Sequence, residues 1–136
     1  MHLNGTQAMA RLSVLIVEDE ALLAMDLQDR LADLGYEIVG TAECADEAVA
    51  LARDRHPHVV LTDIRLAGGS SGIDAARRIR ADFDIPSIFL SGSMEMLSRL
   101  DLAFVRPLGC LAKPCDARAL QALLARVAPS LTAAQH

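Results

Sequence analysis

The segment that decides the fold runs from Leu12 to Glu20 and reads LSVLIVEDE. Residues 12–17 are almost continuously aliphatic and include β-branched side chains, and acidic residues follow them directly. A short run of this kind is typical of a strand that is buried on both faces, as in a parallel sheet. We therefore predict a first strand over residues 12–17 whose carboxyl end carries Glu18 and Asp19.

The same strand-then-helix pattern recurs along the whole chain. Leucines at helical spacing follow the first strand, and Gly35 stands where a left-handed helix cap is favoured. Further strands are predicted over residues 36–42, 58–62, 86–90 and 109–112, and helices over 23–34, 45–55, 73–79, 94–100 and 120–127. Five strands that alternate with five helices predict an α/β fold, with a parallel sheet covered by helices on both faces.

The length and composition of the chain limit the classes of protein to which it can belong. With 136 residues and 52% apolar composition, one domain is predicted over residues 11–128, between a flexible arm over 1–10 and a short tail over 129–136. The net charge of −5 and the lack of a basic cluster argue against direct binding of nucleic acid. No apolar run approaches the roughly 20 residues needed to span a membrane, which favours a cytoplasmic protein without membrane contact.

The cysteines do not indicate a disulfide framework or a zinc site. Their number is odd, with Cys44, Cys110 and Cys115 far apart in an aliphatic chain. No paired spacing of cysteine or histidine supports four zinc ligands. We predict free thiols that pack as small apolar side chains.

The residues that follow the predicted strands carry the chemistry. Glu18 and Asp19 follow the first strand, Asp63 the third, Ser91 the fourth and Lys113 the fifth. Each residue alone has an ordinary explanation as a helix cap, a turn residue or a solvated side chain. Because ligands of such sheets bind at the carboxyl ends of the strands, their joint placement indicates a site. Carboxylates that share a small volume repel one another unless a cation lies between them, and hard oxygen ligands favour Mg²⁺.

Four motifs extend this pattern to a known family. They are VLIVEDE at 14–20, VVLTDIRL at 59–66, IFLSG at 88–92 and LAKP at 111–114. In these motifs and their spacing the chain resembles the receiver domain of two-component response regulators, of which a single-domain form is expected here. The resemblance implies a flavodoxin-like, doubly wound sheet with the strand order 2-1-3-4-5.

The resemblance also implies a function and a role for each residue of the site. Asp63 is expected to accept a phosphoryl group from a sensor histidine kinase or a histidine phosphotransfer protein, assisted by Ser91 and Lys113. Mg²⁺ is expected to bind the side chains of Glu18, Asp19 and Asp63 and the backbone carbonyl of Arg65. Such a domain is a self-phosphorylating switch that signals through protein contact and is not otherwise an enzyme. The family also implies a cis peptide bond between Lys113 and Pro114.

The sequence departs from the family pattern at several places. Cys110 stands where the family usually has a tyrosine or phenylalanine that reports phosphorylation. Gly72, which closes the loop after Asp63, comes one residue later than in the most frequent form, and the predicted helix over 94–100 is short. With Cys110 at this position, we expect any switch to depend on Ser91 and the segment that follows it.

Two other functions are less consistent with the sequence than a phosphorylation switch. A magnesium-dependent phosphatase or phosphomutase with an aspartyl nucleophile typically has a second acid two residues later, where this chain has Arg65. Its length also leaves no room for a cap domain. A phosphorylation-independent scaffold is disfavoured because every residue of the expected site is present.

Overall fold

The computed structural model describes residues 11–66, 71–92, 102–103, 105–114 and 116–133. The arm predicted over 1–10, the helix predicted over 94–100 and Cys115 lie outside the described residues. Among the residues that are described, no helix has both the length and the apolar character needed to cross a membrane.

Five parallel strands form one sheet, as the sequence predicts. They are β1 (Ser13–Val17), β2 (Glu37–Ala42), β3 (Val59–Asp63), β4 (Ser87–Ser91) and β5 (Gly109–Ala112). Their order across the sheet is β2-β1-β3-β4-β5, with β2 at one edge as expected from its less apolar sequence. The expected strand order 2-1-3-4-5 is therefore confirmed.

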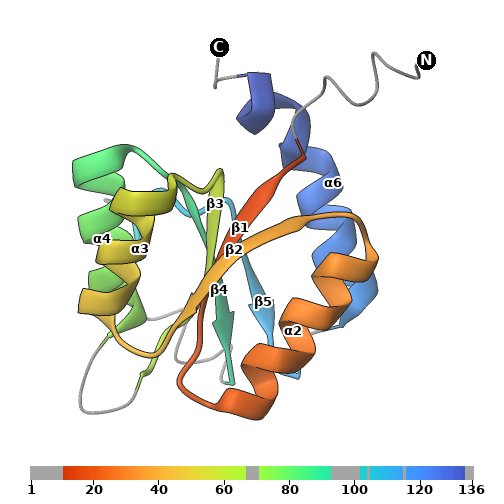
Figure 1. Cartoon of the computed structure of the whole chain (residues 1–136), viewed down its shortest axis with the longest axis horizontal. Helices are drawn as coiled ribbons and strands as arrows, with labels where there is room; N and C mark the ends of the chain where they lie inside the picture. Colours follow the sequence, from red (N-terminus) through yellow and green to blue (C-terminus); the bar gives the residue numbers. More distant parts are fainter. Residues whose placement is uncertain (1–10, 67–70, 93–101, 104, 115, 134–136) are drawn as a thin grey trace.

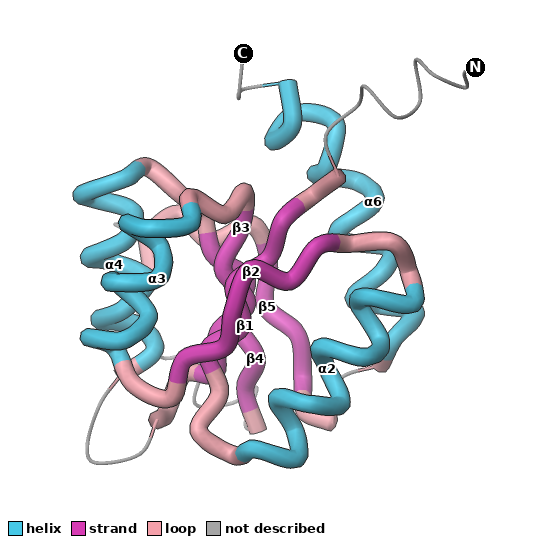
Figure 2. The backbone as a smooth tube through the Cα atoms, viewed as in Figure 1, coloured by secondary structure: helices cyan, strands magenta, loops and turns pink. Residues whose placement is uncertain are grey.

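The described helices cover both faces of the sheet. They are α2 (Ala21–Asp33), α3 (Ala45–Arg55), α4 (Gly72–Phe83) and α6 (Ala117–Ala133). Figure 1 shows α2 and α6 on one side of the sheet and α3 and α4 on the other, and the tube in Figure 2 shows the sheet between these two layers. The flavodoxin-like α/β architecture is confirmed, with four helices in the described residues and the fifth predicted helix outside them.

Alternation along the strands divides the core between the two layers. In β1, Val14 and Ile16 pack in the cluster that includes the α2 and α6 side chains, whereas Leu15 and Val17 pack in the cluster beneath α3 and α4. Successive side chains of a strand point to opposite faces of the sheet. A strand with a helical layer on each face is therefore apolar at nearly every position, which explains why residues 12–17 form an almost continuous aliphatic run.

Local sequence signals end α2 and α3 within one residue of the predicted positions, whereas α4 extends four residues past its predicted end at residue 79. Gly35, just after α2, has a φ of 95°, a left-handed conformation that glycine adopts without strain. His56 caps α3 with a φ of 48°, and Pro57 follows it. At the start of α4, the Ser71 hydroxyl accepts hydrogen bonds from the backbone N–H groups of Ile73 and Asp74, which satisfies two groups that the helix leaves unpaired.

The last helix is longer than the sequence predicts. It continues to Ala133 with Pro129 inside it, although the sequence places a tail from residue 129 onward. Proline removes a backbone donor and normally ends or kinks a helix. Here Val127, Ala128 and Leu131 pack against the core on the α2 and α6 side. Burial of this apolar face therefore extends the helix past the residue that disfavours it.

A buried histidine joins β1 to the start of β3. The Nδ1 atom of His58 accepts a hydrogen bond from the Ser13 backbone N–H at 2.9 Å, and the His58 N–H donates to the Ser13 hydroxyl at 3.1 Å. An Nδ1 atom that accepts carries no proton, so this network assigns a neutral ring with its proton on Nε2. Burial lowers the pKa of His58, and the nearby Glu37 carboxylate only partly opposes this effect.

We expect this histidine to make the fold less stable in mild acid. Because the pKa is lowered in the folded state, the unfolded chain binds the proton first as the pH falls below about 6.5. The free energy of unfolding should therefore fall between that pH and the lower folded-state pKa, by up to about 1.4 kcal/mol per pH unit. Urea unfolding of wild type and of His58→Gln at pH 7.5 and 5.5 measures the effect. An equal loss of stability in both proteins would show that His58 is not its source.

Candidate functional site

The carboxyl ends of four strands meet at one edge of the sheet. Glu18 and Asp19 follow β1, Asp63 is the last residue of β3, Ser91 the last of β4, and Lys113 follows β5. Backbone hydrogen bonds continue the sheet pairing beyond the strands, from Glu18 N–H to the Ala42 carbonyl and from Lys113 N–H to the Ser91 carbonyl, both at 2.8 Å. Parallel pairing therefore gathers residues that are up to 95 positions apart in the chain.

Three carboxylates form a cluster at this edge. Each of Glu18, Asp19 and Asp63 offers an oxygen, and these oxygens lie within 4.8 Å of one another. The Glu18 side chain is buried, and its Oε2 accepts a hydrogen bond from the Glu20 backbone N–H at 3.1 Å. The other two carboxylates are half-buried. Burial raises the pKa of Glu18, although the bond from Glu20 and the ammonium of Lys113 oppose the increase.

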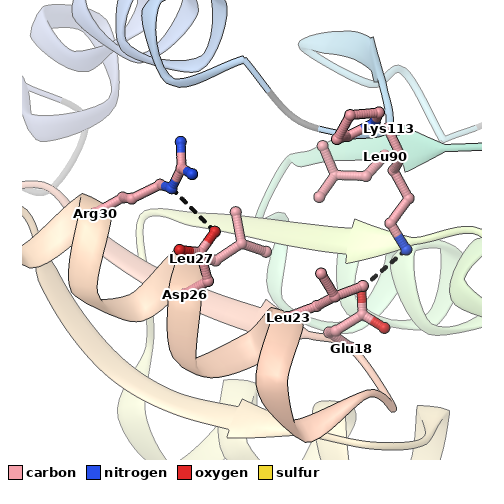
Figure 3. A pocket seen from close by; sticks show the side chains of 8 residues that line it. Glu18, Leu23, Asp26, Leu27, Arg30, Leu90 and Lys113 are labelled. Carbon is pink, nitrogen blue, oxygen red and sulfur yellow. Dashed lines mark hydrogen bonds and ion pairs between the residues drawn. The ribbon is translucent and has the colours of Figure 1, made fainter.

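The ammonium of Lys113 lies between two of these carboxylates. Its Nζ donates to Asp63 Oδ2 at 2.7 Å and to Glu18 Oε1 at 3.0 Å, and Figure 3 shows the lysine reaching toward Glu18. Burial alone would lower the pKa of Lys113, but its hydrogen bonds to Asp63 and Glu18 raise it above its usual value. The peptide bond from Lys113 to Pro114 is cis, as the family resemblance implies.

The donor set fits a small hard cation. Carboxylate oxygens on a rim that is open to water suit Mg²⁺, which usually keeps several water ligands. Arg65, whose carbonyl is the fourth expected ligand, lies in the same turn after β3 and forms an isolated bridge with Ser71. Lys113 supplies one positive charge against three carboxylates, so the cluster keeps a net negative charge that attracts a cation.

Ser91 is brought to the same edge but is buried in the sheet. It is only 2% exposed, and it pairs with Ala112 across β4 and β5. Leu90, the preceding residue, pairs with Asp63, so the serine lies one position beyond Asp63 in the sheet register. The structure therefore groups the five residues that the sequence predicts, with direct contacts among Glu18, Asp63 and Lys113.

Comparisons with known proteins agree with this geometry. The family pattern of the response regulator receiver domain matches residues 14–125. The chain belongs to this family. It is 42% identical over 83 residues to the phyllosphere-induced regulator PhyR of Methylorubrum extorquens, covering 60% of this chain and 31% of that protein. The chain spans about a third of the length of the curated relatives it matches first, 31% and 38%.

Solved receiver structures have the same fold. The signal receiver domain of a modulated diguanylate cyclase from Desulfovibrio desulfuricans G20 is 34% identical with a TM-score of 0.81, and the match covers 90% of this chain and 97% of that one. The anti-anti-sigma factor PhyR from Bartonella quintana is 33% identical with a TM-score of 0.77, covering 96% of this chain and 53% of that one.

Cys110 shows how this receiver departs from the family pattern. It lies in β5 opposite Phe89 and packs against a small cluster formed by Ile64, Ala76, Phe89 and Val105. Ile64 directly follows Asp63, so Cys110 packs in the apolar cluster next to the three carboxylates. Burial raises the pKa of the Cys110 thiol, which disfavours the reactive thiolate. Cys110 and Cys44 are both free thiols, as predicted.

A cavity that the sequence does not reveal adjoins the site. Its volume is about 370 Å³, and its lining is drawn in Figure 3. The lining residues are Glu18, Leu23, Asp26, Leu27, Arg30, Leu90, Lys113 and Pro114. Leu23 and Leu27 belong to the apolar stripe that predicts the first helix. Such a pattern shows which side chains face inward, but not whether other side chains fill the space beside them.

Proposed function

We propose that this receiver accepts a phosphoryl group on the carboxylate of Asp63. The observation that carries the proposal is the position of that carboxylate, 2.7 Å from the Lys113 ammonium and in a cluster with Glu18 and Asp19. Chains of the receiver family belong to response regulators. The donor is a phosphohistidine on a sensor histidine kinase or a histidine phosphotransfer protein.

The transfer is an in-line displacement at phosphorus. An Asp63 Oδ atom forms the new O–P bond as the N–P bond of the phosphohistidine breaks, and the imidazole leaves with the bonding electrons. The Lys113 ammonium is already in place to neutralise charge on the phosphoryl oxygens. Mg²⁺ held by Glu18, Asp19, Asp63 and the Arg65 carbonyl supplies further positive charge when it is bound. Ser91 is proposed to donate a hydrogen bond to the attached phosphoryl group.

The product signals through protein contact. The PhyR relative from Bartonella quintana is described as an anti-anti-sigma factor, which supports an output of this kind. Phosphatases that use an aspartyl nucleophile typically have a general acid two residues after it. Arg65 occupies that position, and a guanidinium does not act as a proton donor near neutral pH. The switch is therefore favoured over the phosphatase.

We expect acetyl phosphate with Mg²⁺ to add one phosphoryl group to the purified protein. The small donor replaces the phosphohistidine, because the catalytic charges belong to the receiver itself. Intact-mass spectrometry measures the adduct, and fragmentation locates it. Excess chelator is the control and should prevent the reaction. An unmodified wild-type protein after long incubation with both reagents would overturn the proposed function.

A further inference from the structure

The first residue of α4 touches the backbone of Asp63. A β-carbon placed on Gly72 would lie 1.6 Å from the Asp63 carbonyl oxygen and 2.8 Å from the Thr62 hydroxyl oxygen, whereas real β-carbons essentially never come within 3.0 Å of another such atom. Both obstacles belong to the end of β3, and the nearer one is backbone. Any larger residue at position 72 must therefore displace the backbone of the phosphoacceptor or the start of the helix.

Space, and not backbone conformation, requires the glycine. Gly35 is the one glycine in the described residues with a positive φ, so position 72 has a backbone that any residue adopts. Gly72 is also buried, which excludes relief by a small outward movement of a surface turn. The close approach of two backbones is the property that only glycine permits here.

Three hydrogen bonds hold the backbone at Asp63 and Ile64. The Thr62 hydroxyl donates to the Asp63 carbonyl at 2.8 Å. The Gly72 N–H donates to the Ile64 carbonyl at 2.7 Å, and the Ile64 N–H donates to the Leu90 carbonyl at 3.2 Å. The two peptide groups that follow Asp63 are thus tied to their own strand, to α4 and to β4.

We propose that Gly72 and Thr62 are positioning residues for the phosphoacceptor. Together they fix the position of the Asp63 backbone carbonyl. This position determines the orientation of the Asp63 side chain, whose carboxylate points toward Lys113. The bridge between Arg65 and Ser71 closes the same turn. The contacts that fix the Asp63 carbonyl therefore also determine the position of the Arg65 carbonyl. This inference rests on the proposed function, because it concerns the orientation of the Asp63 carboxylate and not whether that carboxylate reacts.

Gly72→Ala tests the proposal most directly. The distance between the new β-carbon and the Asp63 carbonyl oxygen must increase from 1.6 Å to at least 3.0 Å. A misplacement of about 1 Å can lower a reaction rate roughly 100-fold. We expect the rate constant for phosphorylation by acetyl phosphate at saturating Mg²⁺ to fall by about that factor. The Mg²⁺ concentration at half of the maximal thermal stabilisation should rise as well.

A control variant separates positioning from loss of stability. In Gly109→Ala the new β-carbon meets the Leu123 side chain at 2.6 Å, within β5 and α6 and away from Asp63. This variant should have a lower melting temperature but a phosphorylation rate within about twofold of wild type, because the substitution does not move the reacting group.

Thr62→Val tests the proposal independently, even if Gly72→Ala does not fold. It keeps the side-chain shape and removes only the hydroxyl, so the Asp63 carbonyl loses one of its bonds, and we expect a rate about tenfold lower. Thr62→Ser restores the hydroxyl and should recover most of the rate. Wild-type rates in both Thr62→Val and any folded Gly72→Ala would overturn the positioning role. That result differs from failure of the proposed function, in which wild type itself is not labelled.

Discussion

We expect Asp63→Asn to abolish phosphorylation by acetyl phosphate. Asparagine has nearly the shape of aspartate, and its amide oxygen can still accept a hydrogen bond from Lys113, so the site should keep its arrangement. An amide is not a competent nucleophile toward phosphorus, so the O–P bond does not form. Intact-mass spectrometry of the two proteins after the same incubation should show the adduct in wild type alone.

Asp19→Asn is the matched control for this variant. It removes the same charge from the same cluster of oxygens but leaves the nucleophile and its contact with Lys113 unchanged. We expect it to be phosphorylated more slowly and to need more Mg²⁺, since one expected metal ligand is weakened. If Asp63→Asn still acquires one phosphoryl group at the rate of Asp19→Asn, another residue is the acceptor and the assignment of Asp63 is wrong.

Much of the fold is predictable because each strand and helix carries its own local signal. Residues 45–55 and 109–112 are predicted with the bounds that the structure has, and the other strands shift by only one residue. The aliphatic runs end at charged or hydroxyl residues, and this marks the carboxyl ends at which the site lies. Parallel pairing then brings Glu18, Asp63 and Lys113 together without further information from the sequence.

Other features depend on contacts between distant segments and have no local signal. In the sequence, Gly72 has the character of an ordinary loop residue. The requirement for glycine becomes clear only in the structure, where the start of α4 packs against the end of β3. Pro129 predicts a helix end, which the packing of Leu131 against the core overrides. The pairing of Ser13 with His58 likewise requires that β1 and β3 be neighbours.

The sequence predicts the lysine of the site but not its partners. From the strand ends alone, the three acids repel one another and need a metal. In the structure, the Lys113 ammonium already bonds two of them, and the Glu18 side chain beside it is only 1% exposed. We therefore propose two roles for the lysine. It stabilises the carboxylates of Glu18 and Asp63 before phosphorylation, and it faces the phosphoryl oxygens during the proposed transfer.

These two roles predict a double effect of Lys113→Met. We expect the rate of phosphorylation to fall by about 10²- to 10³-fold, the usual cost of losing one donor that stabilises transition-state charge. Without Mg²⁺ the melting temperature should also fall, since the carboxylate of Glu18 keeps its burial and loses its cation. Added Mg²⁺ should then raise the melting temperature more in the variant than in wild type, because it binds the native state alone.

Arg30→Met is the matched control for Lys113→Met. Both changes replace a cation with methionine, and both residues line the cavity beside the site, but Arg30 pairs with the exposed Asp26 on α2. An exposed ion pair contributes little to stability, so this variant should keep the wild-type rate and the wild-type response to Mg²⁺. Thermal unfolding with and without Mg²⁺, together with the rate of labelling, measures both effects. A Lys113→Met protein that is labelled as fast as Arg30→Met would show that the ammonium bonded to Asp63 serves the fold and not the transfer.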